Sequence, residues 1–305
     1  MREETLRKKI GRHSLHRLII HPAEGVETTA EAIFYHGQGD YAERYLDILH
    51  PFVDRGIRCT ITELPGHGYS PGVRGHGGDV SLLDAVTHST LDDIKARGDL
   101  PYGVMGHSMG GLLAARHLVL AGQGVFPNPS FAWLSSPLVD PGMGRHPFFL
   151  KTARILAPVL PGLTFSTQVK PENFKRLMDD EIVPAGAVYE KPSCITRSEL
   201  WHNRVSLGWG ISLLDFAHLL RSRLPDICSE IPLLCTQGTQ DMVCPAPLTR
   251  DLFERLPNRN KRYEEIEQLR HEPFSGEGSE RLFKALEEWL ESPGMPVSMQ
   301  EKAPA

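Results

Sequence analysis

A serine flanked by glycines is the residue of this chain with the clearest potential for chemistry. Ser108 lies in the run Gly-His-Ser-Met-Gly-Gly, which begins at Gly106 and matches the pattern G-x-S-x-G. An apolar stretch precedes the run and a helical pattern follows it, so the serine is expected at a sharp turn from strand to helix. Glycines permit the close backbone approach in such a turn, and a helix N-terminus favours a developing anion. Ser108 is therefore the predicted nucleophile.

A serine hydroxyl becomes a good nucleophile when an imidazole accepts its proton and a carboxylate orients that imidazole. In folds that carry this serine motif, the acid and then the histidine follow the serine in the chain. His271 lies just beyond the last expected strand and Asp241 just beyond another, so they are the predicted base and acid. Three other carboxylates stay open as alternatives for the acid: Asp215, Asp226 and Asp251.

An oxyanion that forms during acyl transfer needs two N–H donors held in place beforehand. Met109, the residue after the nucleophile, supplies one, and Gln38 in the run HGQGD (36–40) is the predicted second donor because it directly follows an apolar strand. His67 and His76 lie in a glycine-rich stretch, but no carboxylate or thiolate stands at ligand spacing from them. We therefore predict no metal site, and the chemistry requires no cofactor.

The elements that would position these residues alternate along the chain. Short apolar runs alternate with helical patterns, which is typical of βαβ units and a mainly parallel sheet. The expected strands are 16–20, 32–37, 57–64, 102–108, 131–138, 232–238 and 262–269. The expected helices are 41–54, 81–97, 109–121, 247–256 and 279–291. The predicted fold class is α/β, with a core in two parts (1–136 and 226–292) and a disordered tail (293–305).

Residues 137–225 interrupt this alternation, and we call this insertion the cap. It is rich in proline, glycine and aromatic residues and is predicted to form a lid over the site. Eleven basic and eight acidic residues give it a net charge of +3, which would favour transient contact with an anionic lipid surface. Its apolar stripe suits an acyl chain, although a plain helix core explains the stripe equally well. The residues predicted to contact substrate are Phe148, Phe149, Leu156 and Leu160.

Composition excludes several classes of protein. The chain has 33 basic and 38 acidic residues, a net charge of −5, and no basic stripe suited to a phosphate backbone, so nucleic acid is not an expected partner. No apolar run approaches the roughly 20 residues of a membrane-spanning helix. We expect a cytoplasmic protein, soluble or peripheral to a membrane, and no oligomeric state is indicated. The five cysteines include no CxxC pair and are expected to be free thiols.

The chain resembles the monoacylglycerol lipase and lysophospholipase group of α/β-hydrolases, within the serine aminopeptidase S33 (hydrolase-4) type. Six motifs carry this resemblance, in order: HGQGDYAERY (36–45), ELPGHGYSPGVRG (63–75), GHSMGG (106–111), SSPLV (135–139), GTQDMVC (238–244) and LRHEPF (269–274). The resemblance implies a triad of Ser108, Asp241 and His271, oxyanion donors at Gln38 and Met109, and a helical cap between the sixth and seventh core strands.

The activity that the resemblance implies is hydrolysis of a small amphipathic ester, a monoacylglycerol or a lysophospholipid, through an acyl-enzyme on Ser108. One motif differs, because Asp40 and Tyr41 stand where the group usually carries an acidic residue followed by histidine. That position bears on recognition of a glycerol headgroup. Two other functions use the same motifs: a small-ester carboxylesterase or thioesterase, and a ligand-binding protein that keeps the fold without catalysis.

Overall fold

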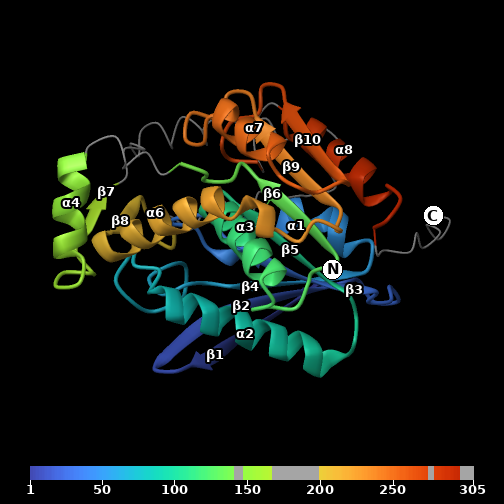
Figure 1. Ribbon diagram of the computed structural model, residues 1–305. Coiled ribbons are helices and arrows are strands. Elements are labelled where there is room, and N and C mark those ends of the chain that lie inside the picture. Colours follow the sequence, from blue (N-terminus) through green and yellow to red (C-terminus); the bar gives the residue numbers. More distant parts are fainter. Residues whose placement is uncertain (141–146, 167–198, 274–277, 296–305) are drawn as a thin grey trace.

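A single sheet lies at the centre of the molecule (Figure 1). The structure is a computed structural model that describes residues 1–140, 147–166, 199–273 and 278–295. In their order across the sheet, the eight strands are β1 (Arg2–Ile10), β2 (His13–His21), β4 (Ile57–Thr62), β3 (Ala30–Tyr35), β5 (Tyr102–His107), β6 (Phe131–Ser135), β9 (Leu233–Gly238) and β10 (Lys261–Ile266). Neighbours from β4 to β10 run parallel, and β1 and β2 join antiparallel at one edge. The mainly parallel α/β sheet predicted from the sequence is confirmed.

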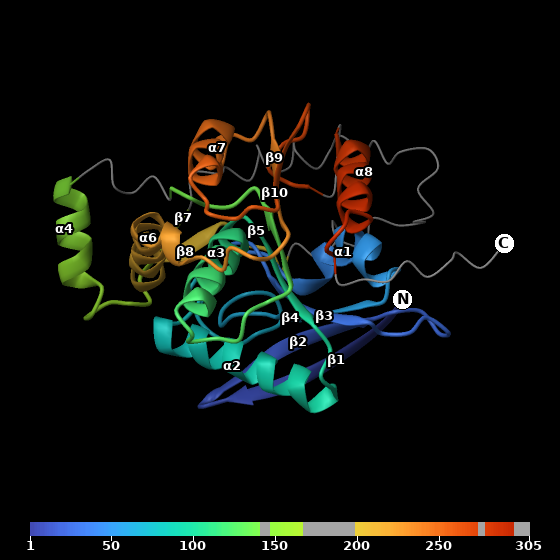
Figure 2. The same ribbon diagram turned by 45° about the vertical axis from the view of Figure 1, so that its right-hand side comes forward.

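Helices cover both faces of this sheet (Figure 2). The covering helices are α1 (Leu46–Val53), α2 (Val80–Arg97), α3 (Met109–Gly122), α7 (Ala246–Glu254) and α8 (Ser279–Leu290). Side chains alternate between the faces: Ile33 and Tyr35 of β3 pack in the core beneath α2 and α3, whereas Ala32 and Phe34 pack against α1 and α8. Because the central strands are buried on both faces, their sequences read as continuous apolar runs.

Five expected strands end earlier than predicted, since those expected over 32–37 and 57–64 end at residues 35 and 62. For the other three, the backbone shows why. The strands expected over 102–108, 131–138 and 262–269 end at residues 107, 135 and 266. Just beyond them, Ser108, Ser136 and Gln268 have φ of 56°, 42° and 65°, the only positive values among described residues other than glycine. This left-handed conformation cannot continue a strand. All three positions lie at the carboxyl edge of the sheet, where strained backbone often accompanies function.

The expected helix over 41–54 is also divided. It forms a 3-10 turn, η1 (Ala42–Tyr45), followed by α1, in which Pro51 lies inside the helix. The sequence pattern places the apolar side chains of this stretch correctly, since Tyr45, Ile48, Leu49 and Phe52 are all buried. The change in helical pitch at Leu46 is not encoded in that pattern.

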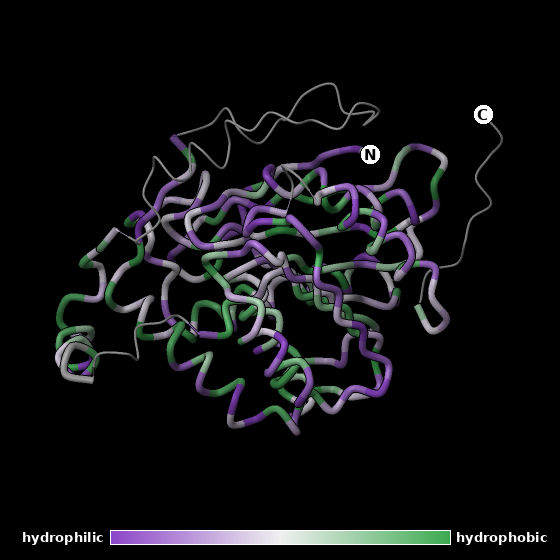
Figure 3. Tube along the Cα trace, turned by 90° about the horizontal axis from the view of Figure 1, so that it is seen from above, coloured by the Kyte–Doolittle hydropathy of each residue, from purple (hydrophilic) through white to green (hydrophobic). Residues whose placement is uncertain are grey.

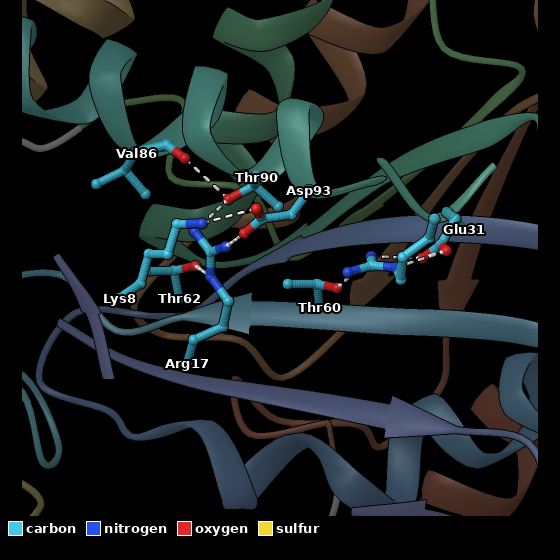
Figure 4. Close-up of polar contacts among 9 residues, drawn as sticks. Lys8, Arg17, Glu31, Thr60, Thr62, Val86, Thr90 and Asp93 are labelled. Atoms are coloured by element: carbon cyan, nitrogen blue, oxygen red, sulfur yellow. Dashed lines mark hydrogen bonds and ion pairs between the residues drawn. The ribbon is translucent and has the colours of Figure 1, made fainter. Parts of the chain in front are cut away.

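A buried arginine fastens helix α2 to the sheet (Figure 4). Arg17 of β2 forms an ion pair with Asp93 of α2 and donates to Thr62 of β4 at 2.8 Å and to Thr90 of α2 at 3.0 Å. Lys8 of β1 contacts the same carboxylate at 2.6 Å. Charged side chains taken out of water are stable only when paired and hydrogen-bonded in this way. The cluster therefore fixes α2 across the antiparallel edge of the sheet.

The described part of the cap lies between β6 and β9, the sixth and seventh strands of the sheet along the chain. Its elements are α4 (Pro147–Leu156), β7 (Thr164–Ser166), β8 (Arg204–Ser206), α6 (Leu207–Ser222) and the turn η3 (Leu224–Asp226). β7 pairs with β8, α4 packs on α6, and α6 packs on α3. Seen from above, hydrophobic segments concentrate along the sheet and occur again on α4 at the left edge (Figure 3). Among the described residues, no helix is both long and apolar enough to cross a bilayer.

Candidate active site

The predicted nucleophile lies at the turn between β5 and α3. Ser108 has φ 56° and ψ −119°, and its backbone N–H donates to the carbonyl of Ser135 at 2.9 Å. Two glycines make the turn possible: a Cβ on Gly106 would lie 2.2 Å from the Gly110 carbonyl oxygen, and one on Gly110 would lie 1.8 Å from that of Tyr35. The hydroxyl is thus held at the N-terminus of α3, which favours negative charge.

The structure brings the three residues of the predicted triad into one hydrogen-bonded chain. His271 Nε2 lies 2.9 Å from Ser108 Oγ, and His271 Nδ1 lies 2.8 Å from Asp241 Oδ2. All three side chains are buried. The alternative acids Asp215 and Asp226 instead contact Arg154 and Gln123, and Asp251 contacts Arg255.

Asp241 is held by the loop in which it lies. Its Oδ1 accepts from the N–H groups of Val243 and Cys244, each at 2.8 Å, and its Oδ2 accepts from Gln237 Nε2 at 2.9 Å. Burial acts to raise the pKa of Asp241, but the nearby imidazole of His271 and these N–H donors outweigh it, so the pKa lies below its ordinary value. The acid is therefore ionised at neutral pH.

The contact between Asp241 and His271 also sets the protonation of the imidazole. Burial acts to lower the pKa of His271, whereas the charge and hydrogen bond of Asp241 raise it, and the net pKa lies above its ordinary value of 6.5. A histidine in this position can accept the serine proton and return it later. The arrangement has the geometry that nucleophilic acyl transfer requires.

Cys244 extends this cluster. Its thiol is buried, and its sulfur lies with Asp241 and His271 in a group whose potential ligand atoms are within 4.8 Å of one another. Burial raises the pKa of Cys244 well above its ordinary value, so the thiol stays protonated. A metal would need a thiolate and free lone pairs, whereas the imidazole and carboxylate are already bonded to each other. In the described part of the chain, Cys59, Cys228, Cys235 and Cys244 are free thiols, as expected, and Cys194 lies outside it.

The two predicted oxyanion donors come from different elements. Met109 is the first residue of α3, and Gln38 lies in the segment 36–40 after β3, which we call the HGQGD loop. Gly39 has φ 80°, and a Cβ there would lie 1.8 Å from the carbonyl oxygen of His202. Within the described residues, neither the Gln38 nor the Met109 backbone N–H donates a hydrogen bond. Their service as oxyanion donors stays a prediction.

The glycine-rich stretch contributes His67 to a cluster of three histidine rings that the sequence does not predict. The ring of His67 lies 5.0 Å from that of His36 and 5.1 Å from that of His202 of the cap. Burial lowers the pKa of all three imidazoles, so they are neutral at pH 7. His76 contacts Ser206 Oγ at 2.7 Å. These residues join the loop between β4 and α2 to the cap.

A second buried group beside the triad was not predicted. Arg44 of η1 forms ion pairs with Asp40 of the HGQGD loop and, at 2.8 Å, with Glu272, the neighbour of His271. Tyr45 OH donates to the other Asp40 oxygen at 2.5 Å. The sequence does not show Arg44 and Glu272 as partners, because they lie 228 positions apart.

The cap residues predicted to contact substrate are more exposed than the triad. Leu156 and Leu160 are 41 % and 48 % exposed, whereas the triad is buried. Phe148 and Phe149 lie in α4, and their side chains are outside the described part. Contact of these residues with a substrate stays a prediction.

A family model described as serine aminopeptidase, S33, matches residues 27–278, which includes every residue of the site. The chain belongs to this S33 family. Solved structures place the S33-family protein in the α/β-hydrolase fold: it aligns with the crystal structure of the Paleococcus ferrophilus monoacylglycerol lipase with a TM-score of 0.72 and 25% identity over 91% of this chain and 98% of that one. The predicted fold and family are confirmed.

Curated relatives of this S33-family protein are distant. Monoacylglycerol lipase of Mycolicibacterium smegmatis is 25% identical over 85% of this chain and 87% of its own length. Phospholipase YtpA of Bacillus subtilis is 26% identical over 84% and 93%. An uncharacterized abhydrolase domain-containing protein of Dictyostelium discoideum is 25% identical over 87% of this chain, which spans only 26% of that larger protein.

Proposed function

We propose that this protein hydrolyses lipid-type carboxylic esters, with monoacylglycerols or lysophospholipids as substrates, through an acyl-enzyme on Ser108. The observation that carries the proposal is the chain of hydrogen bonds from Ser108 Oγ through His271 to Asp241, at 2.9 Å and 2.8 Å. The protein is a carboxylic ester hydrolase, in keeping with its family and with its relatives named lipase and phospholipase.

The proposed reaction has two halves. Ser108 Oγ attacks the ester carbonyl carbon while its proton passes to His271 Nε2, and the resulting oxyanion accepts hydrogen bonds from the N–H groups of Gln38 and Met109. The imidazolium then donates its proton to the alcohol oxygen as the carbon–oxygen bond breaks. In the second half, His271 takes a proton from water, which attacks the acyl-enzyme and releases the acid and Ser108. Asp241 stays ionised throughout.

The preference for lipid-type esters is supported by the exposed surface of the cap. Large apolar side chains between 41 and 75 % exposed follow one another on α4, the turn after it and β7: Ile155, Leu156, Val159, Leu160, Leu163 and Phe165. Grouped apolar side chains of this kind mark contact surfaces for lipids or partners. Each methylene of an acyl chain that becomes buried would add about 0.8 kcal/mol of binding. We therefore propose that the cap meets the substrate at a lipid surface.

The experiment is hydrolysis of a panel of monoacylglycerols, lysophospholipids, short p-nitrophenyl esters and aminoacyl p-nitroanilides by the wild type and Ser108→Ala. We expect cleavage of the long-chain esters, and a fall in kcat of roughly 10⁵-fold or more in the variant. An unchanged rate in Ser108→Ala would refute the mechanism. Cleavage of the anilides alone would refute ester hydrolysis.

Chain-length dependence separates the proposal from a small-ester carboxylesterase or thioesterase. We expect decanoyl p-nitrophenyl esters to have the higher kcat/KM, because the exposed apolar groups of the cap favour long chains. A preference for acetyl esters would favour the small-ester function. An intact protein whose Ser108 never reacts with a fluorophosphonate would favour a ligand-binding role.

A further inference from the structure

The segment of the cap that leads into α6 is bonded directly to the HGQGD loop. His202 N–H donates to the Gly39 carbonyl at 3.0 Å, and Gln38 Nε2 donates to the Arg204 carbonyl at 2.6 Å. The absence of a side chain at Gly39 allows this approach. Hydrogen bonds from the cap therefore hold the loop that would supply one oxyanion donor.

Trp209 joins the two candidate donor residues to each other. Its indole Nε1–H lies 2.9 Å from Gln38 Oε1 and 3.3 Å from Met109 Sδ, so a single N–H is shared between both side chains. Gln38 is thus bonded at both ends of its amide, since its Nε2 is held by Arg204.

The position of Trp209 is itself well determined. The side chain is fully buried, and its backbone N–H donates to Ser206 Oγ at 3.2 Å, which begins helix α6. A Cβ on Gly77 would lie 2.5 Å from the indole, so the β4–α2 loop closes against the ring. Phe216, two turns further along α6, meets the ring edge at 6.1 Å between centroids. The indole therefore has little freedom to move.

We propose that Trp209 is a positioning residue that sets the relative placement of the Gln38 and Met109 backbone N–H groups. This inference rests on the proposed function, in which these two groups bind the oxyanion. Stabilisation by two donors requires both to lie within hydrogen-bond reach of one oxygen atom, and it is strong only when they are held there before the reaction. The side chain of Gln38 is held by Trp209 and Arg204 of the cap, so the cap is in direct contact with the residue that carries this N–H group.

The test compares two tryptophan-to-phenylalanine variants. Trp209→Phe removes the shared N–H donor and keeps an aromatic ring. Trp133→Phe is the matched control, because Trp133 is equally buried and also donates its indole N–H, to Thr236 Oγ1 at 3.0 Å, and its ring packs on Phe34 and Phe52. Both are assayed on the best ester of the panel, with folding checked by circular dichroism and thermal unfolding.

We expect kcat of Trp209→Phe to fall about 10- to 100-fold, less than the 10²- to 10³-fold loss on removal of a whole oxyanion donor, with KM changed less than about threefold. The affinity for a trifluoromethyl ketone, which forms a tetrahedral oxyanion on the serine, should fall in parallel with kcat/KM. Trp133→Phe should keep its kcat. Equal kcat in all three folded proteins, or equal losses in both variants, would overturn the inference.

Gln38→Met serves if Trp209→Phe does not fold. Gln38 is only partly buried, and methionine keeps the backbone N–H while removing both ends of the amide. We expect a similar fall in kcat, and a double variant no slower than the slower single one, because both changes break the same contact. An unaltered kcat in Gln38→Met would contradict the inference. A wild type that cleaves no ester and reacts with no fluorophosphonate would refute the proposed function itself, and the inference with it.

Discussion

Replacement of Arg44 by methionine should destabilise the protein because two buried carboxylates lose the cation with which they are paired. Arg44, Asp40 and Glu272 are 1 %, 4 % and 9 % exposed, and one guanidinium serves both acids. Methionine fills a similar length without charge. In Arg44→Met, Asp40 keeps the hydroxyl of Tyr45, but Glu272 loses its closest cation.

The expected cost follows from this burial. Removing one partner of a buried ion pair typically costs about 3–5 kcal/mol, because the remaining charge is neither solvated nor paired. For a chain of this size the corresponding fall in Tm is about 10 °C. Arg281→Met is the control: its ion pair with Glu267 is 53 % and 76 % exposed, and its loss should have no measurable effect.

The pH dependence gives the sharper test. Burial raises the pKa of Glu272, and Arg44 opposes that rise, so in Arg44→Met the pKa should rise further. An acid whose folded-state pKa is raised contributes stability below its unfolded pKa and loses it as the pH rises through the folded value. The stability deficit of the variant should therefore be smaller at pH 5 than at pH 8.

The assay is urea unfolding of the wild type, Arg44→Met and Arg44→Met/Glu272→Gln at both pH values. The second change removes the unpaired charge, so most of the lost stability should return at pH 8. Two results would show that an unpaired buried Glu272 carboxylate is not the cause. One is a loss of unfolding free energy in Arg44→Met that is the same at both pH values, and the other is a larger loss when Glu272→Gln is added.

Three further predictions concern the site. Since the pKa of His271 is raised by Asp241, kcat/KM should fall as the pH drops through a value above 6.5. Asp241→Asn should move this acidic limb of the pH–rate profile to lower pH and reduce kcat by roughly 10³- to 10⁴-fold. An acidic limb at the same pH in both proteins would exclude His271 as the base. Gly110→Ala should destabilise the fold by about 3 kcal/mol because its Cβ would meet the Tyr35 carbonyl at 1.8 Å, whereas Gly162→Ala, with no atom closer than 3.9 Å, should be neutral in thermal unfolding; equal stability of the two would contradict this. Initial rates should be the same with and without EDTA. A loss of activity in EDTA that added zinc reverses would refute the metal-free mechanism.

The order of the core elements from β2 onward could be read from the sequence because hydrophobic burial marks the strands, whereas β1 is mostly exposed and was not among the expected strands. Strands such as β5 and β9 are buried on both faces, and so their apolar runs are continuous. The ends of β6 and β10 could not be read, because the left-handed conformations of Ser136 and Gln268 just beyond them are imposed by the loops that follow. Helix α6 was missed for a similar reason. Its first turn contains Gly208 and Gly210, which disfavour a helix, and packing on α3 overrides them.

Chemistry and chain order were enough to nominate Ser108, Asp241 and His271, which the fold brings within hydrogen-bond distance of one another. The residues that support them were not foreseen. Trp209 contacts Gln38 and Met109, and Arg44 contacts Glu272, all of them remote in the chain, although Asp40 lies only four residues before Arg44. Such partner choices become visible only once the tertiary structure is known.

The bonding of residues 202–209 to the HGQGD loop and Met109 has a consequence for engineering this family. Four hydrogen bonds join these two parts of the molecule. A chimera that imports a foreign cap with junctions at both ends of 137–225 would discard all four, whereas one whose second junction precedes residue 202 would retain them. Grafts intended to change acyl-chain preference should therefore exchange the part of the cap before residue 202 and leave the rest native.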